Sequence, residues 1–128
     1  MGVPAAFYEP FVQRLRALHV EPVVIDLPGQ GLSPLRARRG DDYGYREVVE
    51  DLVPGVLKDL AERHPGRPLL LGGHSLGGQL ALLACHEQAT RIDGLVLVAA
   101  GTAHWRAWPK GRRLRAALAV HAISVAAR

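Results

Sequence analysis

Apolar residues along the chain follow two spacings, one typical of amphipathic helices and one typical of buried strands. Over 7–18 they recur every three or four positions, with charged and amide side chains between them, which predicts a helix of about three turns. The same spacing over 45–64 predicts a second helix, which Pro54 and Gly55 should kink or split. Apolar residues at 80–85 predict a third helix, buried on most sides.

Three short apolar runs, over 23–25, 69–71 and 95–98, predict buried strands. They alternate with the helices in the order helix, strand, helix, strand, helix, strand. Continuous apolar strands that alternate with helices indicate an α/β fold, in which helices cover both faces of a parallel sheet. The connections between the strands should be right-handed.

The segment with the clearest chemistry lies where the second predicted strand meets the third helix. It reads Gly73-His74-Ser75-Leu76-Gly77-Gly78. A strand, then Gly-x-Ser-x-Gly, then a helix is the arrangement of a nucleophile elbow, whose sharp turn holds the serine hydroxyl out at the end of the sheet. Ser75 is therefore the candidate nucleophile, and the turn should hold its backbone in a strained conformation. A glycine-rich turn that binds phosphate is the alternative, but the segment lacks the lysine of a phosphate loop.

The same turn gives the neighbouring residues their expected roles. The strand and the helix should crowd each other two residues to either side of the serine, where Gly73 and Gly77 have no side chain to clash, and Gly78 gives further room. The backbone N–H of Leu76 lies at a helix N-terminus and points to where an oxyanion would form. We expect His74 to be structural and to pack near the turn.

A second motif, after the first predicted strand, extends the pattern. It reads Asp26-Leu27-Pro28-Gly29-Gln30-Gly31-Leu32-Ser33. With this loop, the elbow and the run over 95–99, the chain from position 1 to about 101 resembles the α/β-hydrolase fold family, especially its esterase, monoacylglycerol-lipase-like and serine-aminopeptidase-like branches. The three segments are similar to the family's Asp-x-x-Gly-x-Gly-x-Ser loop, its elbow and its sixth strand.

The resemblance implies a serine hydrolase that acts on a small-molecule ester or related acyl substrate, with no metal or organic cofactor. Met1-Gly2-Val3 aligns with the family's His-Gly-x loop, which implies the backbone N–H of Val3 as the second oxyanion donor beside Leu76. It also implies that residues 1–101 are the central portion of the domain, without its N-terminal and C-terminal strands. The runs over 23–25 and 69–71 would then flank the position of an absent strand.

No acid or histidine after Ser75 is well placed to complete a catalytic triad. Glu87 falls on the third helix and Asp93 at the opposite end of the sheet, and we expect His104 to belong to a loop or to the base of a lid. A serine hydroxyl without a base is a poor nucleophile near neutral pH. We therefore expect a truncated and weakly active enzyme, with a non-catalytic remnant or interaction protein that keeps the scaffold as the alternative.

The range 102–128 is a basic tail rich in Trp, Arg and Ala, which the resemblance places at the start of a lid region. Contact with an anionic membrane surface and an unstructured end are the alternatives for this tail. The net charge of +4 comes largely from arginine, a bias typical of GC-rich coding sequence, so we expect no nucleic-acid partner. The single cysteine, Cys85, excludes an internal disulfide, and no secretory signal pattern is present. These features predict a cytoplasmic location and leave the oligomeric state open.

Overall fold

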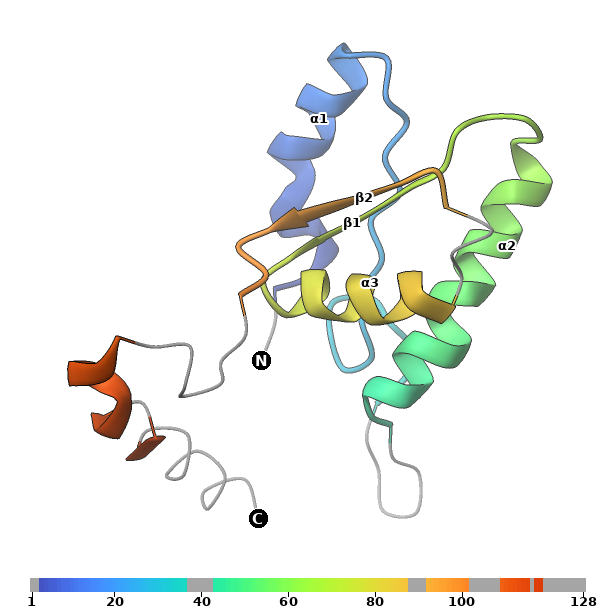
Figure 1. The fold of residues 1–128 in the computed structure, drawn as a ribbon. Coiled ribbons are helices and arrows are strands. Elements are labelled where there is room, and N and C mark those ends of the chain that lie inside the picture. The colour runs from blue at the N-terminus through green and yellow to red at the C-terminus, as the bar shows by residue number, and fades with distance from the viewer. Residues whose placement is uncertain (1–2, 37–42, 88–91, 102–108, 116, 119–128) are drawn as a thin grey trace.

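The computed structural model describes residues 3–36, 43–87, 92–101, 109–115 and 117–118 (Figure 1). The tail residues 102–108, 116 and 119–128, and with them His104, lie outside this part. The described helical elements and strands are η1 (Ala5–Tyr8), α1 (Glu9–Ala17), η2 (Glu47–Leu52), α2 (Val53–Arg63), β1 (Leu70–His74), α3 (Leu76–Glu87), β2 (Gly94–Val98) and η5 (Lys110–Arg112). Among them, no helix is long and apolar enough to cross a membrane.

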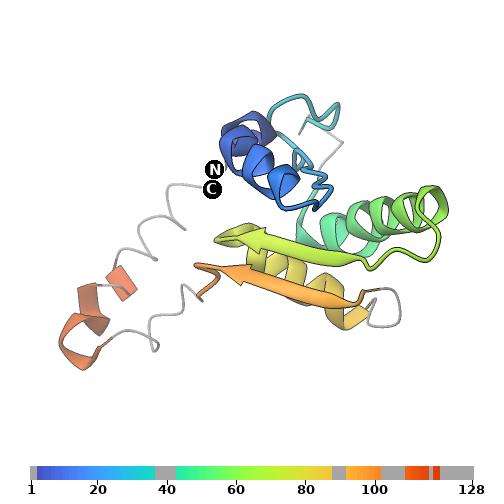
Figure 2. The same cartoon turned by 90° about the horizontal axis from the view of Figure 1, so that it is seen from above.

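The two strands form a parallel sheet with α3 as the connection between them. The register runs from Leu70 opposite Gly94 to His74 opposite Val98. Helix α3 packs along one face of the strands, and α1 lies on their other side, beside β1 rather than over β2 (Figures 1 and 2). The strands predicted near 69–71 and 95–98 are therefore present, and they form the parallel strand–helix–strand arrangement expected of an α/β fold.

The first predicted strand is not formed. The segment over 23–25 pairs with neither strand, and Val23 and Val24 are exposed. Val23 and Ile25 line an apolar groove together with Leu70 of β1 and residues of α2. The β-branched pattern identifies a segment suited to a strand, but strand pairing also requires an adjacent backbone edge. Here the facing edge of β1 lies across the groove.

Pro54 splits the second helix, as the sequence predicted. Its ring conflicts with the carbonyl of the residue four positions earlier, Glu50, and it has no N–H to donate. The chain responds with a wider π-helical turn, η2, and α2 begins at Val53 with the proline in its first two positions. Helix α2 ends at Arg63, and Gly66 follows with a φ of 76°.

The buried core lies between η2, α2 and α3, and the partly buried Leu71 of β1 packs against it. It consists of Val48, Val49, Val53, Leu57, Leu80 and Ala84, from η2, α2 and α3. By contrast, three apolar side chains of β2 remain at least 44% exposed: Val96, Leu97 and Val98. The expectation that helices cover both faces of the sheet is therefore wrong for β2 among the described residues. Successive side chains alternate between the faces of a strand, so these three exposed residues lie on both faces, and α1 lies beside β1 rather than over β2 (Figure 2).

We expect Leu80→Ala to lower the free energy of unfolding by about 3 kcal/mol, because it removes buried methyl groups and leaves a cavity in the core. Leu82 on the same helix is 52% exposed, so Leu82→Ala should change stability by less than about 0.5 kcal/mol. Urea unfolding followed by circular dichroism measures both values. Equal losses in the two variants would contradict this placement of the core.

Candidate active site

Ser75 lies alone between the last residue of β1 and the first residue of α3. Its φ is 54°, a left-handed conformation that costs a residue with a Cβ on the order of 1 kcal/mol or more. The backbone holds it there: the Ser75 N–H donates to the carbonyl of Val98 at 2.8 Å, and its own carbonyl accepts from the Gly78 N–H at 3.1 Å. The residue is exposed. The turn therefore presents a hydroxyl at the carboxyl end of the sheet.

Glycine is sterically required at two of the three positions expected around Ser75. A Cβ on Gly73 would overlap the backbone of Gly77 and Gly78, and a Cβ on Gly78 would lie 2.8 Å from the carbonyl oxygen of Gly73. A Cβ on Gly77, however, would meet no atom within 4 Å. The prediction that Gly77 is kept small by a clash is therefore wrong. Its backbone is part of the contact with the strand, whereas its Cβ direction points into open space.

The two predicted oxyanion donors lie on different elements. Leu76 is the first residue of α3, so its N–H belongs to the amides that have no acceptor within the helix. Val3 is exposed and lies two residues before η1, while Met1 and Gly2 lie outside the described residues. Their roles as oxyanion donors stay predictions.

His74 contacts a residue that the sequence did not suggest. The hydroxyl of Tyr8 lies 3.0 Å from Nδ1 of His74, and the two rings meet edge to face with centroids 6.2 Å apart. This agrees with the structural role expected for His74. Tyr8 lies within the helix predicted over 7–18, and nothing in the spacing of that helix identifies a partner 66 positions away.

Asp26 is a second residue without a predicted role. Its Oδ1 accepts the backbone N–H of Ala5 at 2.6 Å, and its Oδ2 accepts that of Leu32 at 2.9 Å. These two hydrogen bonds, aided by the charge of Arg36, lower the pKa of Asp26 below its ordinary value of 3.8. The carboxylate thus joins the N-terminal turn to the loop over 26–33. The only sequence signal was its place at the start of that motif.

The two acidic candidates, Asp93 and Glu87, both lie at the opposite end of the sheet or helix from Ser75. Asp93 precedes β2, where its Oδ2 accepts the N–H of Leu69 at 2.7 Å. This contact lies at the amino end of both parallel strands, opposite the elbow. Glu87 is the last residue of α3, at the far end of the helix from Ser75. Among the described residues, no cluster of three side chains could hold a metal ion.

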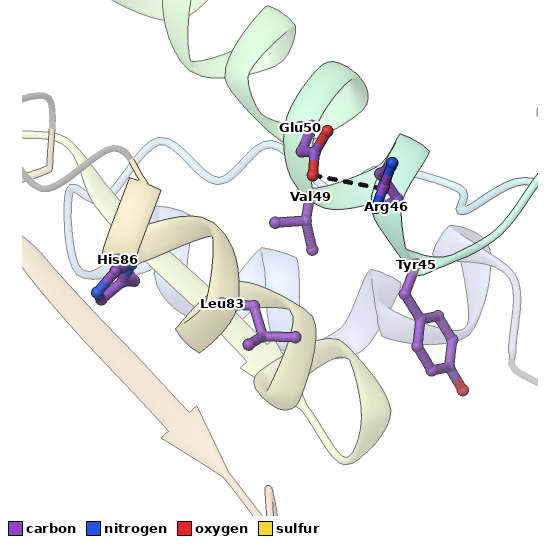
Figure 3. Close-up of a pocket in the computed structure, with 6 residues that line it drawn as sticks. All are labelled: Tyr45, Arg46, Val49, Glu50, Leu83 and His86. Carbon is purple, nitrogen blue, oxygen red and sulfur yellow. Dashed lines mark ion pairs between the residues drawn. The ribbon is translucent and has the colours of Figure 1, made fainter.

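A shallow hollow opens on the outer side of the helices (Figure 3). It is lined by Tyr45, Arg46, Val49, Glu50, Leu83 and His86. Arg46 and Glu50 form an exposed ion pair across 3.7 Å at one wall. Because α3 contributes Leu83 and His86, two turns or more beyond the start of the helix, this hollow is separate from the elbow.

The chain matches known proteins along most of its length. The family described as serine aminopeptidase, S33, matches residues 1–126. A monoglyceride lipase of Rattus norvegicus is 30% identical over 91 residues, which are 71% of this chain and 29% of the relative. A monoglyceride lipase of Homo sapiens is 37% identical over 65 residues, which are 46% of this chain and 22% of the relative. The chain therefore spans less than a third of these curated relatives, and no solved structure matches it.

The glycine contacts predict opposite effects for two neighbouring substitutions. Gly73→Ala should lower the free energy of unfolding by about 3 kcal/mol or more, because its methyl group would overlap backbone that cannot move independently. Gly77→Ala should be neutral or stabilise by up to about 1 kcal/mol, because alanine favours the helix and nothing obstructs it. Urea unfolding of both variants tests this. A larger loss for Gly77→Ala would overturn the observed geometry.

The pKa of Asp26 predicts how stability depends on pH. A carboxyl whose pKa is lower in the folded state stabilises the fold above the unfolded pKa, and this contribution is lost as pH falls through the folded value. Wild type should therefore be more stable than Asp26→Asn at pH 7, and the difference should shrink below about pH 4. Thermal unfolding from pH 7 to 2 measures this difference. A gap that stays constant to pH 2 would contradict the assignment.

Proposed function

Because the chain belongs to the serine aminopeptidase, S33, family of α/β-hydrolases, we propose that it provides the nucleophile and oxyanion donors of a serine hydrolase. The observation that carries this proposal is the exposed Ser75 with a φ of 54° between β1 and α3. A strained serine at that junction is the geometry in which a nucleophile elbow presents its hydroxyl.

In the proposed reaction, the Ser75 oxygen attacks an acyl carbonyl carbon and forms a tetrahedral intermediate. The negative oxygen of that intermediate lies against the N–H groups of Leu76 and Val3. The N-terminus of α3 adds positive partial charge at the same place. A backbone donor of this kind typically contributes about 3 kcal/mol to stabilising the transition state. The intermediate then collapses to an acyl-enzyme, and the leaving group departs.

The base that accepts the Ser75 proton is a separate part of the proposal. Asp93 is committed to the opposite end of the sheet, and Glu87 ends α3. We therefore propose that the histidine and the acid of the triad are contributed by regions of the whole protein beyond the described residues. The described residues alone should react slowly, since binding and oxyanion donors leave only part of the catalysis.

The proposed substrate is a carboxylic ester with an acyl chain. The names of the relatives support it, because monoglyceride lipases match 71% and 46% of this chain at 30% and 37% identity. The family name would also suit an amide, and both substrate classes present an acyl carbonyl to the serine. The alternative function is a non-catalytic protein that keeps the hydrolase scaffold, which the placement of Asp93 favours.

A fluorophosphonate probe tests whether Ser75 is a competent nucleophile. We expect slow covalent labelling of the folded chain, because the hydroxyl is exposed and beside helix amides, and labelling should disappear in Ser75→Ala. Ser33→Ala is the matched control, since it removes a serine hydroxyl from the loop over 26–33 and should keep the labelling rate. Mass spectrometry of intact protein gives the extent of labelling. A folded chain with no labelling at Ser75 would support the non-catalytic alternative.

A further inference from the structure

The turn η1 has little hydrophobic contact to fix its position. None of its residues is buried, Phe7 is 64% exposed, and the preceding Pro4 makes no side-chain capping hydrogen bond. The helix that follows, α1, buries only Val12. Apart from Val12, polar contacts are therefore what holds this segment next to the turn at Ser75.

One polar contact holds the start of the turn. Asp26 accepts the Ala5 N–H at 2.6 Å, and its second oxygen is held by the N–H of Leu32 at 2.9 Å. Gly31, with a φ of 42°, passes so close that a Cβ there would overlap the carboxylate. The loop thus fixes the orientation of Asp26. A hydrogen bond from an amide to a charged carboxylate is about twice as strong as a neutral one.

A second polar contact holds the end of the turn. The Tyr8 hydroxyl meets Nδ1 of His74 at 3.0 Å, and the edge-to-face packing of the rings limits their rotation. His74 is itself rigid, since it pairs with Val98 in the sheet. Tyr8 therefore joins the N-terminal segment to the residue that immediately precedes Ser75.

From these contacts we propose that Asp26 and Tyr8 are positioning residues, which together set the place of the Val3 N–H relative to Ser75. Asp26 holds the Ala5 N–H, and Val3 lies two residues before Ala5. Two residues span at most about 7 Å, so the Val3 N–H lies within that distance of the Ala5 N–H. Neither side chain touches the reacting atoms, and both act through the turn. This inference rests on the proposed function, because it assigns Val3 as an oxyanion donor.

The test measures the rate at which a fluorophosphonate probe labels Ser75 in the full chain. Asp26→Asn and Tyr8→Phe should each slow labelling about tenfold or more, because misplacing a group by about 1 Å can cost a factor of 10². The double variant should be no slower than the worse single variant, since both changes release the same donor.

Two matched controls separate this effect from a general loss of hydrogen bonds. Glu47→Gln changes another carboxylate that accepts a backbone N–H, from Gly44, and whose pKa is likewise lowered by backbone hydrogen bonds. Tyr45→Phe removes a phenolic hydroxyl from a residue that lines the hollow of Figure 3. Both should label at the wild-type rate. A slowing equal to that of Asp26→Asn or Tyr8→Phe would overturn the proposal.

The variant Val3→Pro lacks the N–H at position 3. Combining it with the other two variants tests whether Asp26 and Tyr8 act through this N–H or only through stability. In this background, Asp26→Asn and Tyr8→Phe should cause no further slowing. Continued tenfold slowing would show that the two residues act on stability or on another group, and would overturn the assignment.

Amide chemical shifts distinguish failure of this inference from failure of the proposed function. If wild type is not labelled, the proposed function fails, and the ¹⁵N–¹H signals of Val3 and Ala5 still report the position of the turn. Both signals should move in Asp26→Asn and Tyr8→Phe and stay in place in the two controls. Unchanged Val3 signals in both variants would overturn the positioning role whether or not Ser75 reacts.

Discussion

The contact between the backbone of Gly73 and the first turn of α3 is the constraint on which the rest of the structure depends. Because no Cβ fits between Gly73 and the Gly77–Gly78 backbone, the helix can start directly after the strand. That close start forces Ser75 into its left-handed conformation and leaves the residue exposed. The same approach brings the helix amides to the end of the sheet. The absence of a Cβ at Gly73 therefore brings the Ser75 hydroxyl and the positive end of α3 to the same place.

Helix α3 links this site to the part of the molecule that provides stability. Its first residues form the turn that follows Ser75, while Leu80 and Ala84 belong to the core shared with η2 and α2. The strained turn thus lies at the start of α3, and the buried residues of that helix lie one to two turns later. Strain of this kind persists only where the surrounding structure over-determines it. Here the core fixes the helix, and the pairing of β1 with β2 fixes the strand.

The sequence predicted those features that depend on neighbours along the chain and failed on those that depend on distant ones. The helices, the split at Pro54 and the strands near 69–71 and 95–98 follow from local spacing, and all are present. The strand over 23–25 is absent because pairing requires a second edge, which no local pattern guarantees. Gly73 and Gly77 occupy equivalent places in the motif, yet only coordinates show which Cβ direction is blocked. The partners of Tyr8 and Asp26 were likewise invisible, because chain folding alone brings them together.

The groove beside β1 has a consequence for how this polypeptide behaves in solution. In the described sheet, β1 pairs only with β2, so the donors and acceptors along its other flank face the apolar groove. An unpaired strand flank with exposed apolar side chains is a template for adding further strands. Self-association should therefore grow steeply with protein concentration. The net charge of +4 lies in the range that favours solubility of a small domain, so it is this strand flank, and not the charge, that favours association.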